Sequence, residues 1–259
     1  MVVFVFILGL LVGSFLNVVI YRLHRGESYW KGFSRCLFCG HRLYAQDLVP
    51  LFSYIFLKGR CRYCRQPFSA QYFWIELATG LIFSLIFWHL FPGGDIDLVA
   101  GKALGSIFLW WVLAAFLIVI FVYDWRYYLI LDKVIWPAAL VAIIAGILGN
   151  YSLADLLVGA VVGGGFFLLQ FVLSRGRWIG GGDIRLGVLM GLILGWPQIL
   201  TALFLAYVSG SLLAVILLIA GRKGWQDKIP FGTFLSLATV VVMLYGQEIW
   251  NGYLNLFLR

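Results

Sequence analysis

Long runs of apolar residues alternate with short polar breaks along almost the whole chain. Because a helix that crosses a bilayer needs about 20 mostly apolar residues, these runs predict membrane-spanning helices. The first run has no basic segment before it and no small-residue cleavage pattern after it, so we expect a retained span rather than a signal peptide. The predicted spans are 2–21, 72–91, 103–123, 133–149, 155–174, 186–197, 199–220 and 231–247.

This pattern predicts an all-α polytopic membrane protein with about eight transmembrane helices. The sixth stretch is short, and Gly187, Gly191, Gly195 and Pro197 favour a helix that kinks, tilts or packs closely against its neighbours. The chain is 63% hydrophobic and 12% charged with a mean hydropathy of +0.99. Soluble domains have about 45–50% apolar and about 25% charged residues, so the composition excludes an ordinary soluble domain.

The distribution of basic residues predicts the orientation. If the N-terminus lies outside, 17 of the 19 Lys and Arg residues fall in inside loops, and only Lys102 and Arg259 lie on the other side. The positive-inside rule favours this arrangement. The net charge of +8 is thereby explained by topology, and we expect no nucleic-acid partner. The inside loops are 22–71, 124–132 with Lys133 at its boundary, 175–185 and 221–230.

Residues 22–71 form the one large polar insertion and carry all four cysteines. We therefore expect three parts: a first transmembrane helix at 1–21, a small cytoplasmic domain at 22–71, and a transmembrane bundle at 72–259. The cysteines form two CxxC pairs separated by 21 residues, a spacing typical of tetrahedral zinc coordination. The proposed ligands are Cys36, Cys39, Cys61 and Cys64.

A four-cysteine zinc site has no open coordination position, so we expect the metal to be structural. Two alternatives stay open from the residues alone. The cysteines could form disulfides, although a cytoplasmic loop keeps thiols reduced, or they could share no role.

Two aspartates lie where apolar stretches meet the predicted inside face. Asp124 ends the third stretch, and Asp183 follows three glycines just before the sixth. Ionisable residues at membrane depth usually pair and mark a functional site. Two adjacent carboxyls could share a proton, one acting as general base on water and the other as general acid toward a scissile carbonyl oxygen. This pattern is typical of an aspartic peptidase.

Other interpretations of these acids remain open at this point. Asp183 could be an ordinary first-turn carboxylate, since capping and the helix dipole favour aspartate there. Asp132 competes with Asp124 for the role of first catalytic acid, because both flank one short loop. Glu76, at the inner end of the second stretch, could orient a substrate amine or a methyl donor, or could be a helix-start carboxylate or a partner of loop arginines.

The sequence resembles the bacterial type IV prepilin peptidases, the bifunctional leader peptidases and N-methyltransferases. The likeness covers nearly the whole chain, and the double CxxC loop together with the GxGD pattern is its most specific part. It rests on GSFLNVVIYRLHRGES at 13–28, SRCLFCGH at 34–41, LKGRCRYCRQPFSAQYFWIELATG at 57–80, DWRYYLILD at 124–132, GGGDIRL at 180–186 and PFGTFL at 230–235.

The resemblance implies that Asp124 and Asp183 are the catalytic pair, with Gly180 and Gly182 as the glycines of the GxGD motif. It also implies cleavage of type IV prepilins or type II secretion pseudopilins after the glycine that ends a basic leader. Methylation of the new amino terminus from S-adenosylmethionine would follow. The location implied is the bacterial inner membrane, with the active site at the cytoplasmic face.

The chain departs from the family pattern at three positions. Leu131 stands where proline is usual, Arg185 replaces a common lysine, and Thr233 replaces a common proline. Two functions of other classes compete with the peptidase. A transporter would place its acids in mid-span and usually show inverted repeats, and a non-catalytic membrane adaptor would use the zinc loop to bind a partner.

Overall fold

The structure is a computed structural model that describes residues 1–91, 101–149, 151–221, 224 and 228–257. Among these residues all regular structure is helical, and the β-type pairing consists of two isolated bridges, Arg35 with Arg42 and Arg60 with Pro67. The predicted all-α class is confirmed. Three parts of the predicted topology lie outside what the structure describes. They are the side chain of Lys102, the residue Arg259 and part of the predicted inside loop 221–230.

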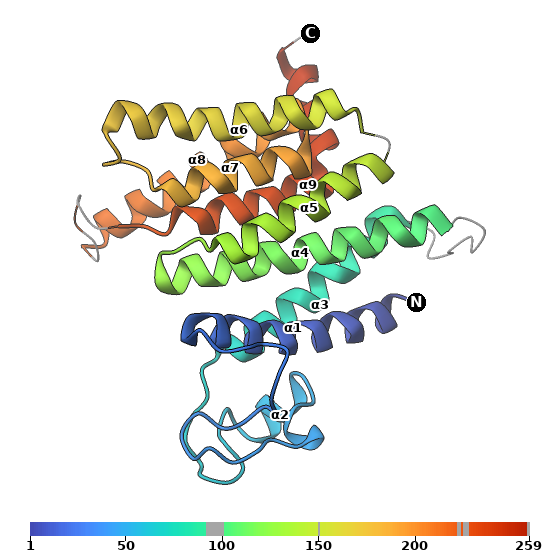
Figure 1. The fold of residues 1–259 in the computed structure, drawn as a ribbon, viewed down its shortest axis with the longest axis vertical. Coiled ribbons are helices and arrows are strands. Elements are labelled where there is room, and N and C mark those ends of the chain that lie inside the picture. The colour runs from blue at the N-terminus through green and yellow to red at the C-terminus, as the bar shows by residue number, and fades with distance from the viewer. Residues whose placement is uncertain (92–100, 150, 222–223, 225–227, 258–259) are drawn as a thin grey trace. The chain divides into compact units, whose positions relative to one another are not determined.

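The chain divides into two compact units, Met1–Val99 and Ala100–Arg259. The first unit contains the helices α1 (Val2–Arg25) and α3 (Gln71–Leu90), which pack against each other. The loop between them carries the short helices η1 (Ala45–Asp47) and α2 (Phe52–Phe56), seen in Figure 1.

Small residues bring α1 and α3 into close contact. A Cβ atom added at Gly9 would lie 2.7 Å from the Cα of Gly80, and one added at Gly13 would lie 2.7 Å from the Cα of Glu76. Helix α1 ends at Gly26, which adopts φ 69° and donates its amide to the helix. Glycine takes this left-handed conformation without a steric penalty, so the chain can leave the helix there.

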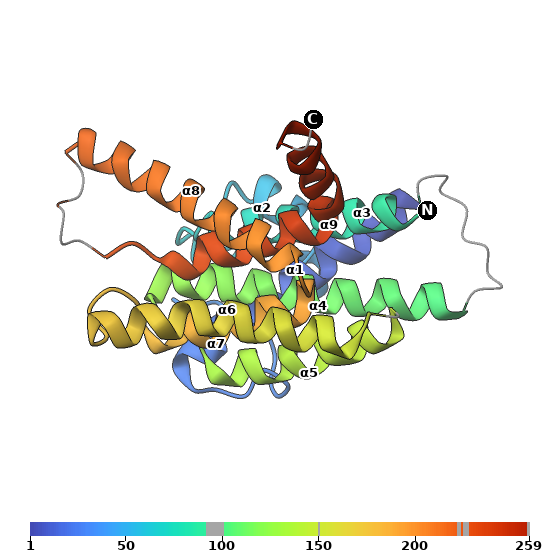
Figure 2. The ribbon, with the colours of Figure 1, turned by 90° about the horizontal axis from the view of Figure 1, so that it is seen from above.

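The second unit is a bundle of six helices: α4 (Gly101–Tyr127), α5 (Asp132–Leu148), α6 (Leu153–Ser174), α7 (Gly181–Leu194), α8 (Gln198–Ile219) and α9 (Phe231–Phe257). Helix α7 packs against α5, α6 and α9, while α9 also packs against α4 and α8. Figure 2 shows that the end of α9 turns away from its first part, at the non-helical residue Tyr245.

Glycines also set the contact between α6 and α7. A Cβ atom at Gly159 would lie 2.6 Å from the carbonyl oxygen of Gly191 and 3.0 Å from the Cα of Gly195. The close packing predicted for the sixth apolar stretch is therefore confirmed. Helix α7 begins at Gly181, five residues earlier than the predicted span, so Asp183 lies inside the first turn of the helix rather than before it.

Six helices of the described chain are long and apolar enough to cross a membrane: Val2–Arg25, Gln71–Leu90, Gly105–Tyr127, Leu153–Ser174, Gln198–Ile219 and Phe231–Leu256. The predicted spans 133–149 and 186–197 correspond to α5 and α7, which have 17 and 14 residues. Both are shorter than the roughly 20 residues that a span usually needs. Six of the predicted spans are thus confirmed, and a count of eight is not.

Candidate active site and metal centre

Asp124 lies in the last turn of α4, and only 5% of its surface is exposed. Its Oδ2 accepts a hydrogen bond of 3.0 Å from the backbone amide of Thr233, in the first turn of α9. Gly232 precedes this amide, and a Cβ atom there would lie 2.9 Å from the same oxygen. The carboxylate therefore contacts helix backbone directly, at a point where any side chain would displace it.

Asp183 occupies the first turn of α7, and its Oδ2 accepts a hydrogen bond of 3.2 Å from the amide of Gly180. The capping interaction expected of a first-turn aspartate is therefore present. Asp183 also lies close enough to Asp124 for the two carboxylates to interact electrostatically. Because the same side chain caps α7 and interacts electrostatically with Asp124, the two interpretations do not exclude each other.

The glycines before Asp183 act through small size rather than unusual backbone angles. Gly180 has φ −82° and ψ 155°, values that any residue adopts. At Gly182, by contrast, a Cβ atom would lie 3.0 Å from the Cβ of Ile130. The GxGD segment can therefore approach the loop that follows α4 closely.

Asp132 is engaged elsewhere, in an ion pair with Arg185. The Asp132 side chain is 52% exposed and that of Arg185 36%, and the Arg185 Nε also donates to the carbonyl of Gly181 at 3.2 Å. Arg185 therefore connects the start of α5 to the start of α7. Leu131, which stands in place of the family's proline, has an extended backbone (φ −89°, ψ 130°) and α5 begins directly after it.

The four cysteines meet in one cluster, in which all four sulfur atoms lie within 4.8 Å of one another. None forms a disulfide. Cys36 and Cys61 are buried, and the Sγ atoms of Cys36 and Cys64 are 3.8 Å apart. Tetrahedral zinc with bonds of about 2.3 Å to sulfur places its ligands roughly 3.8 Å apart. The cluster can therefore hold a metal ion of this kind.

The Cys64 thiol resists ionisation without a cation. The backbone amide of Gln66 favours the Cys64 thiolate, but burial and hydrogen bonds with the three other cysteines outweigh it and raise the pKa of Cys64 to about 12. A bound divalent metal supplies the positive charge that makes thiolates favourable.

Asp47 connects the two cysteine pairs. Its side chain is 3% exposed and accepts bonds from the Arg62 Nε at 2.6 Å and the Tyr63 hydroxyl at 3.1 Å, both within the second pair. The amide of Tyr44, which follows the first pair, donates at 3.1 Å. Burial opposes ionisation, but the bond from Arg62 and the other donors together lower the pKa of Asp47 below its usual value.

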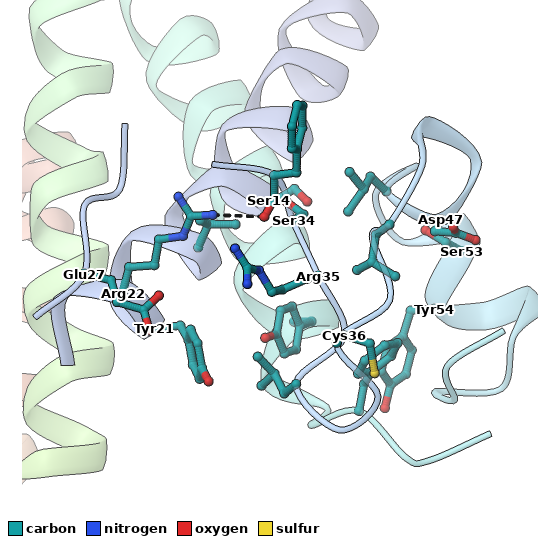
Figure 3. A pocket seen from close by; sticks show the side chains of 18 of the residues that line it. Ser14, Tyr21, Arg22, Glu27, Ser34, Arg35, Cys36, Asp47, Ser53 and Tyr54 are labelled. Atoms are coloured by element: carbon teal, nitrogen blue, oxygen red, sulfur yellow. Dashed lines mark hydrogen bonds between the residues drawn. The ribbon is translucent and has the colours of Figure 1, made fainter. Parts of the chain in front are cut away.

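Glu76 is buried within the first unit, where its Oε2 accepts a hydrogen bond of 2.8 Å from the amide of Leu51. It lies against α1, where a Cβ atom added at Gly13 would be 2.7 Å from the Cα of Glu76. Beside it is a cavity of about 480 Å³ between α1, the loop and the start of α3. Figure 3 shows Tyr21, Arg22, Glu27 and Arg35 around this cavity.

Three contacts were not expected from the sequence. The Thr233 amide and the Leu51 amide are backbone donors, which no side-chain pattern reveals. Asp47 gave no signal because a single acid in a basic loop is unremarkable. The PFGTFL segment carried one hint, since Thr233 departs there from the family pattern that the sequence resembles, and its amide contacts Asp124.

Comparison with known proteins accounts for most of the chain. The bacterial peptidase A24 N-terminal domain matches residues 7–90, and the type IV leader peptidase family matches residues 111–215. No solved structure matches significantly.

Proteins named prepilin leader peptidase/N-methyltransferase are similar over nearly their whole length. That of Aeromonas hydrophila is 30% identical, covering 98% of this chain and 94% of its own. Those of Pseudomonas aeruginosa and Pseudomonas putida are 32% and 31% identical, each covering 96% of this chain and 92% of its own. The chain therefore belongs to the type IV leader peptidase family.

Proposed function

We propose that this protein is a membrane endopeptidase that removes the basic leader from type IV prepilins or type II secretion pseudopilins, cutting after glycine. Asp124 and Asp183 together activate a water molecule. One carboxylate takes a proton from the water as its oxygen attacks the scissile carbonyl carbon, and the other carboxyl donates a proton to the carbonyl oxygen. Collapse of the tetrahedral species breaks the C–N bond as the leaving amine is protonated.

The observation that carries this proposal is the pairing of the two acids. They come from α4 and α7, interact electrostatically, and each accepts a backbone amide on one oxygen. A carboxylate held in this way keeps its other oxygen for water or substrate. The relatives' names supply the substrate class.

The test is cleavage of a purified prepilin by detergent-solubilised enzyme, read by intact mass. We expect loss of cleavage in Asp124→Asn and in Asp183→Asn, and retention in Asp132→Asn, whose carboxylate is already paired with Arg185. Equal cleavage by all three variants and the wild type would exclude Asp124 and Asp183 as the catalytic pair. A non-catalytic adaptor would not cleave prepilin at all and predicts that Asp124→Asn and Asp183→Asn leave its function intact.

We place methylation of the new amino terminus in the first unit, at the cavity beside Glu76. Its volume of about 480 Å³ suits a nucleoside-sized ligand such as S-adenosylmethionine. The lining groups also fit this donor. Glu27 and Glu76 can receive a cationic group, Arg25 and Lys31 a carboxylate, and Tyr21 and Tyr54 an aromatic base.

Binding of S-adenosylmethionine, measured by calorimetry, tests this assignment separately from activity. Glu76→Gln keeps an oxygen for the Leu51 amide but removes the charge, so we expect weaker binding with intact peptide cleavage. Glu248→Gln makes the same charge change on an exposed residue of α9 and serves as the control. Unchanged binding in Glu76→Gln would exclude Glu76 from the site.

The remaining features complete the proposal. We assign structural zinc to the four-cysteine cluster, and the bacterial inner membrane as the location. The N-terminus would lie outside and the aspartates at the cytoplasmic face, with α5 and α7 as the two short spans of an eight-helix topology. The basic residues of the loops support this orientation.

A further inference from the structure

Residues 48–57 expose a group of large apolar side chains that nothing in the described part of the first unit covers. The group consists of five side chains within nine residues, and between 37% and 79% of the surface of each side chain's residue is exposed. They are Leu48, Val49, Phe52, Ile55 and Phe56. A patch of this density on a loop indicates a binding surface rather than a solvated one.

The position of this segment along the membrane-spanning helices is set by its contact with α3. The Leu51 amide donates to Glu76 Oε2, and Glu76 lies against α1 at Gly13, the residue before Ser14. Both helices are long and apolar enough to span a membrane. The segment therefore lies against two spans, at the level of Glu76 and Ser14.

The distance from the helix ends follows from the helical rise. At about 1.5 Å per residue, Glu76 lies about 8 Å along α3 from Gln71, and Ser14 lies about 12 Å along α1 from Arg22. Each headgroup layer of a bilayer is roughly 5–8 Å thick. With Gln71 and Arg22 at the membrane surface, Leu51 would be level with the boundary between headgroups and acyl chains, or slightly deeper.

The backbone of the segment is suited to that position. Lipid does not tolerate unpaired amides, and here the amides of Phe52, Ser53, Ile55 and Leu57 bond to carbonyls within the segment. The amide of Leu51, which has no carbonyl partner in this turn, is satisfied by Glu76. Leu51 adopts φ 59°, a conformation rare for a side-chain-bearing residue, and the Glu76 bond fixes it.

We propose that residues 48–57 insert into the leaflet on the side of Arg22 and Arg25, with Phe52, Ile55 and Phe56 among the acyl chains. The charges at the end of the segment match this occupant, because Lys58 and Arg60 are exposed where lipid phosphates would lie. The loop of the first unit is thus anchored in the membrane at its middle as well as at both ends. This inference does not depend on the proposed peptidase activity.

Three exposed phenylalanines provide a matched test. Phe4 lies on α1, Phe38 lies between the first two cysteines, and Phe56 ends α2. Each is replaced in turn by p-acetylphenylalanine, which takes a nitroxide label without using cysteine. The labelled proteins are placed in vesicles of phosphatidylethanolamine and phosphatidylglycerol after their circular dichroism and elution volume match those of the unlabelled protein.

Power saturation of the nitroxide then compares access to oxygen, which concentrates in lipid, with access to a water-soluble nickel chelate. We expect the oxygen-to-nickel ratio at Phe56 to approach that at Phe4 and to exceed that at Phe38 severalfold. A ratio at Phe56 no higher than at Phe38 would overturn the proposal.

Discussion

The amide of Thr233 donates to the carboxylate of Asp124, joining residues that are 109 positions apart in the chain. In the family pattern that the sequence resembles, proline is common at the position of Thr233, and proline has no amide hydrogen to donate. This chain therefore provides a donor to its proposed catalytic acid that a proline-bearing relative lacks at this position. The amide is free for this role because the first amides of a helix have no partner within the helix.

Thr233→Pro should fold, since proline is tolerated in a first helical turn, but should cleave prepilin about tenfold more slowly. A hydrogen bond to a charged group contributes roughly 1.5–3 kcal/mol, and its loss leaves Asp124 less well positioned. Thr233→Ala keeps the amide and loses only the hydroxyl bond to Pro230, so its rate should stay near wild type. Equal initial rates for the two variants would show that the amide does not assist Asp124.

Gly232→Ala tests the space beside the same carboxylate. The added methyl group would lie 2.9 Å from Asp124 Oδ2 and 3.0 Å from Ile130 Cδ1, so the carboxylate must move. Displacement of a catalytic group by about 1 Å can cost about a hundredfold in rate, and we expect a loss of this order. The control is Gly252→Ala in the same helix, where a Cβ atom meets nothing within 4 Å. Comparable rates for both proteins would argue against Asp124 as a catalytic residue.

Sequence patterns predicted the helices better than they predicted the contacts between them. The apolar runs located α1, α3, α4, α6, α8 and α9, because length and hydropathy suffice for long spans. They misplaced the start of α7, since the glycines of the GGGD segment were interpreted as a loop, whereas Gly181 and Gly182 are already helical. Local composition alone does not show whether a glycine run bends the chain or packs closely.

The site was predictable to the extent that it consists of side chains with distinctive spacing. The cysteine cluster followed from two CxxC pairs, and Asp124 and Asp183 from acids at the ends of apolar runs. Spacing leaves Asp124 and Asp132 as alternatives, and the family resemblance favours Asp124. That Asp132 pairs with Arg185 is visible only in the fold. Backbone donors such as the Leu51 amide depend on long-range packing and leave no trace in a sequence.

The ion pair between Asp132 and Arg185 should have a small effect. Exposed pairs contribute roughly 0.2–1 kcal/mol, so Arg185→Gln should lower the cleavage rate no more than about fivefold and leave the unfolding midpoint nearly unchanged. Arg185→Lys keeps the positive charge, so its cleavage rate should lie between those of Arg185→Gln and the wild type. A complete loss of cleavage in Arg185→Gln would assign the guanidinium a direct role in the reaction.

Gly159→Ala should destabilise the second unit, because the new Cβ atom would lie 2.6 Å from the Gly191 carbonyl oxygen, on the backbone of α7. Overpacking of this kind costs about 1–3 kcal/mol. Gly165→Ala changes the same helix where nothing lies within 4 Å, and should be neutral or slightly stabilising. Unfolding midpoints in detergent, measured by circular dichroism, distinguish the two. Identical midpoints would contradict the proposed glycine contact.

Asp47→Asn should weaken metal retention although Asp47 is not itself a proposed ligand. The buried carboxylate receives bonds from Arg62 and Tyr63 of the second cysteine pair and from the amide after the first pair. Neutral asparagine loses the charge-assisted part of these bonds, and supporting residues of this kind typically change metal affinity by about 10–100-fold. Zinc transfer to a colorimetric chelator measures the effect, with Glu248→Gln as a control for the loss of one negative charge. The cysteines are unaltered in both variants. Faster zinc transfer from Asp47→Asn alone would therefore show that the carboxylate holds the two cysteine pairs in the positions that bind the metal. Equal transfer from both variants would mean that the cysteines and the metal maintain these positions without Asp47.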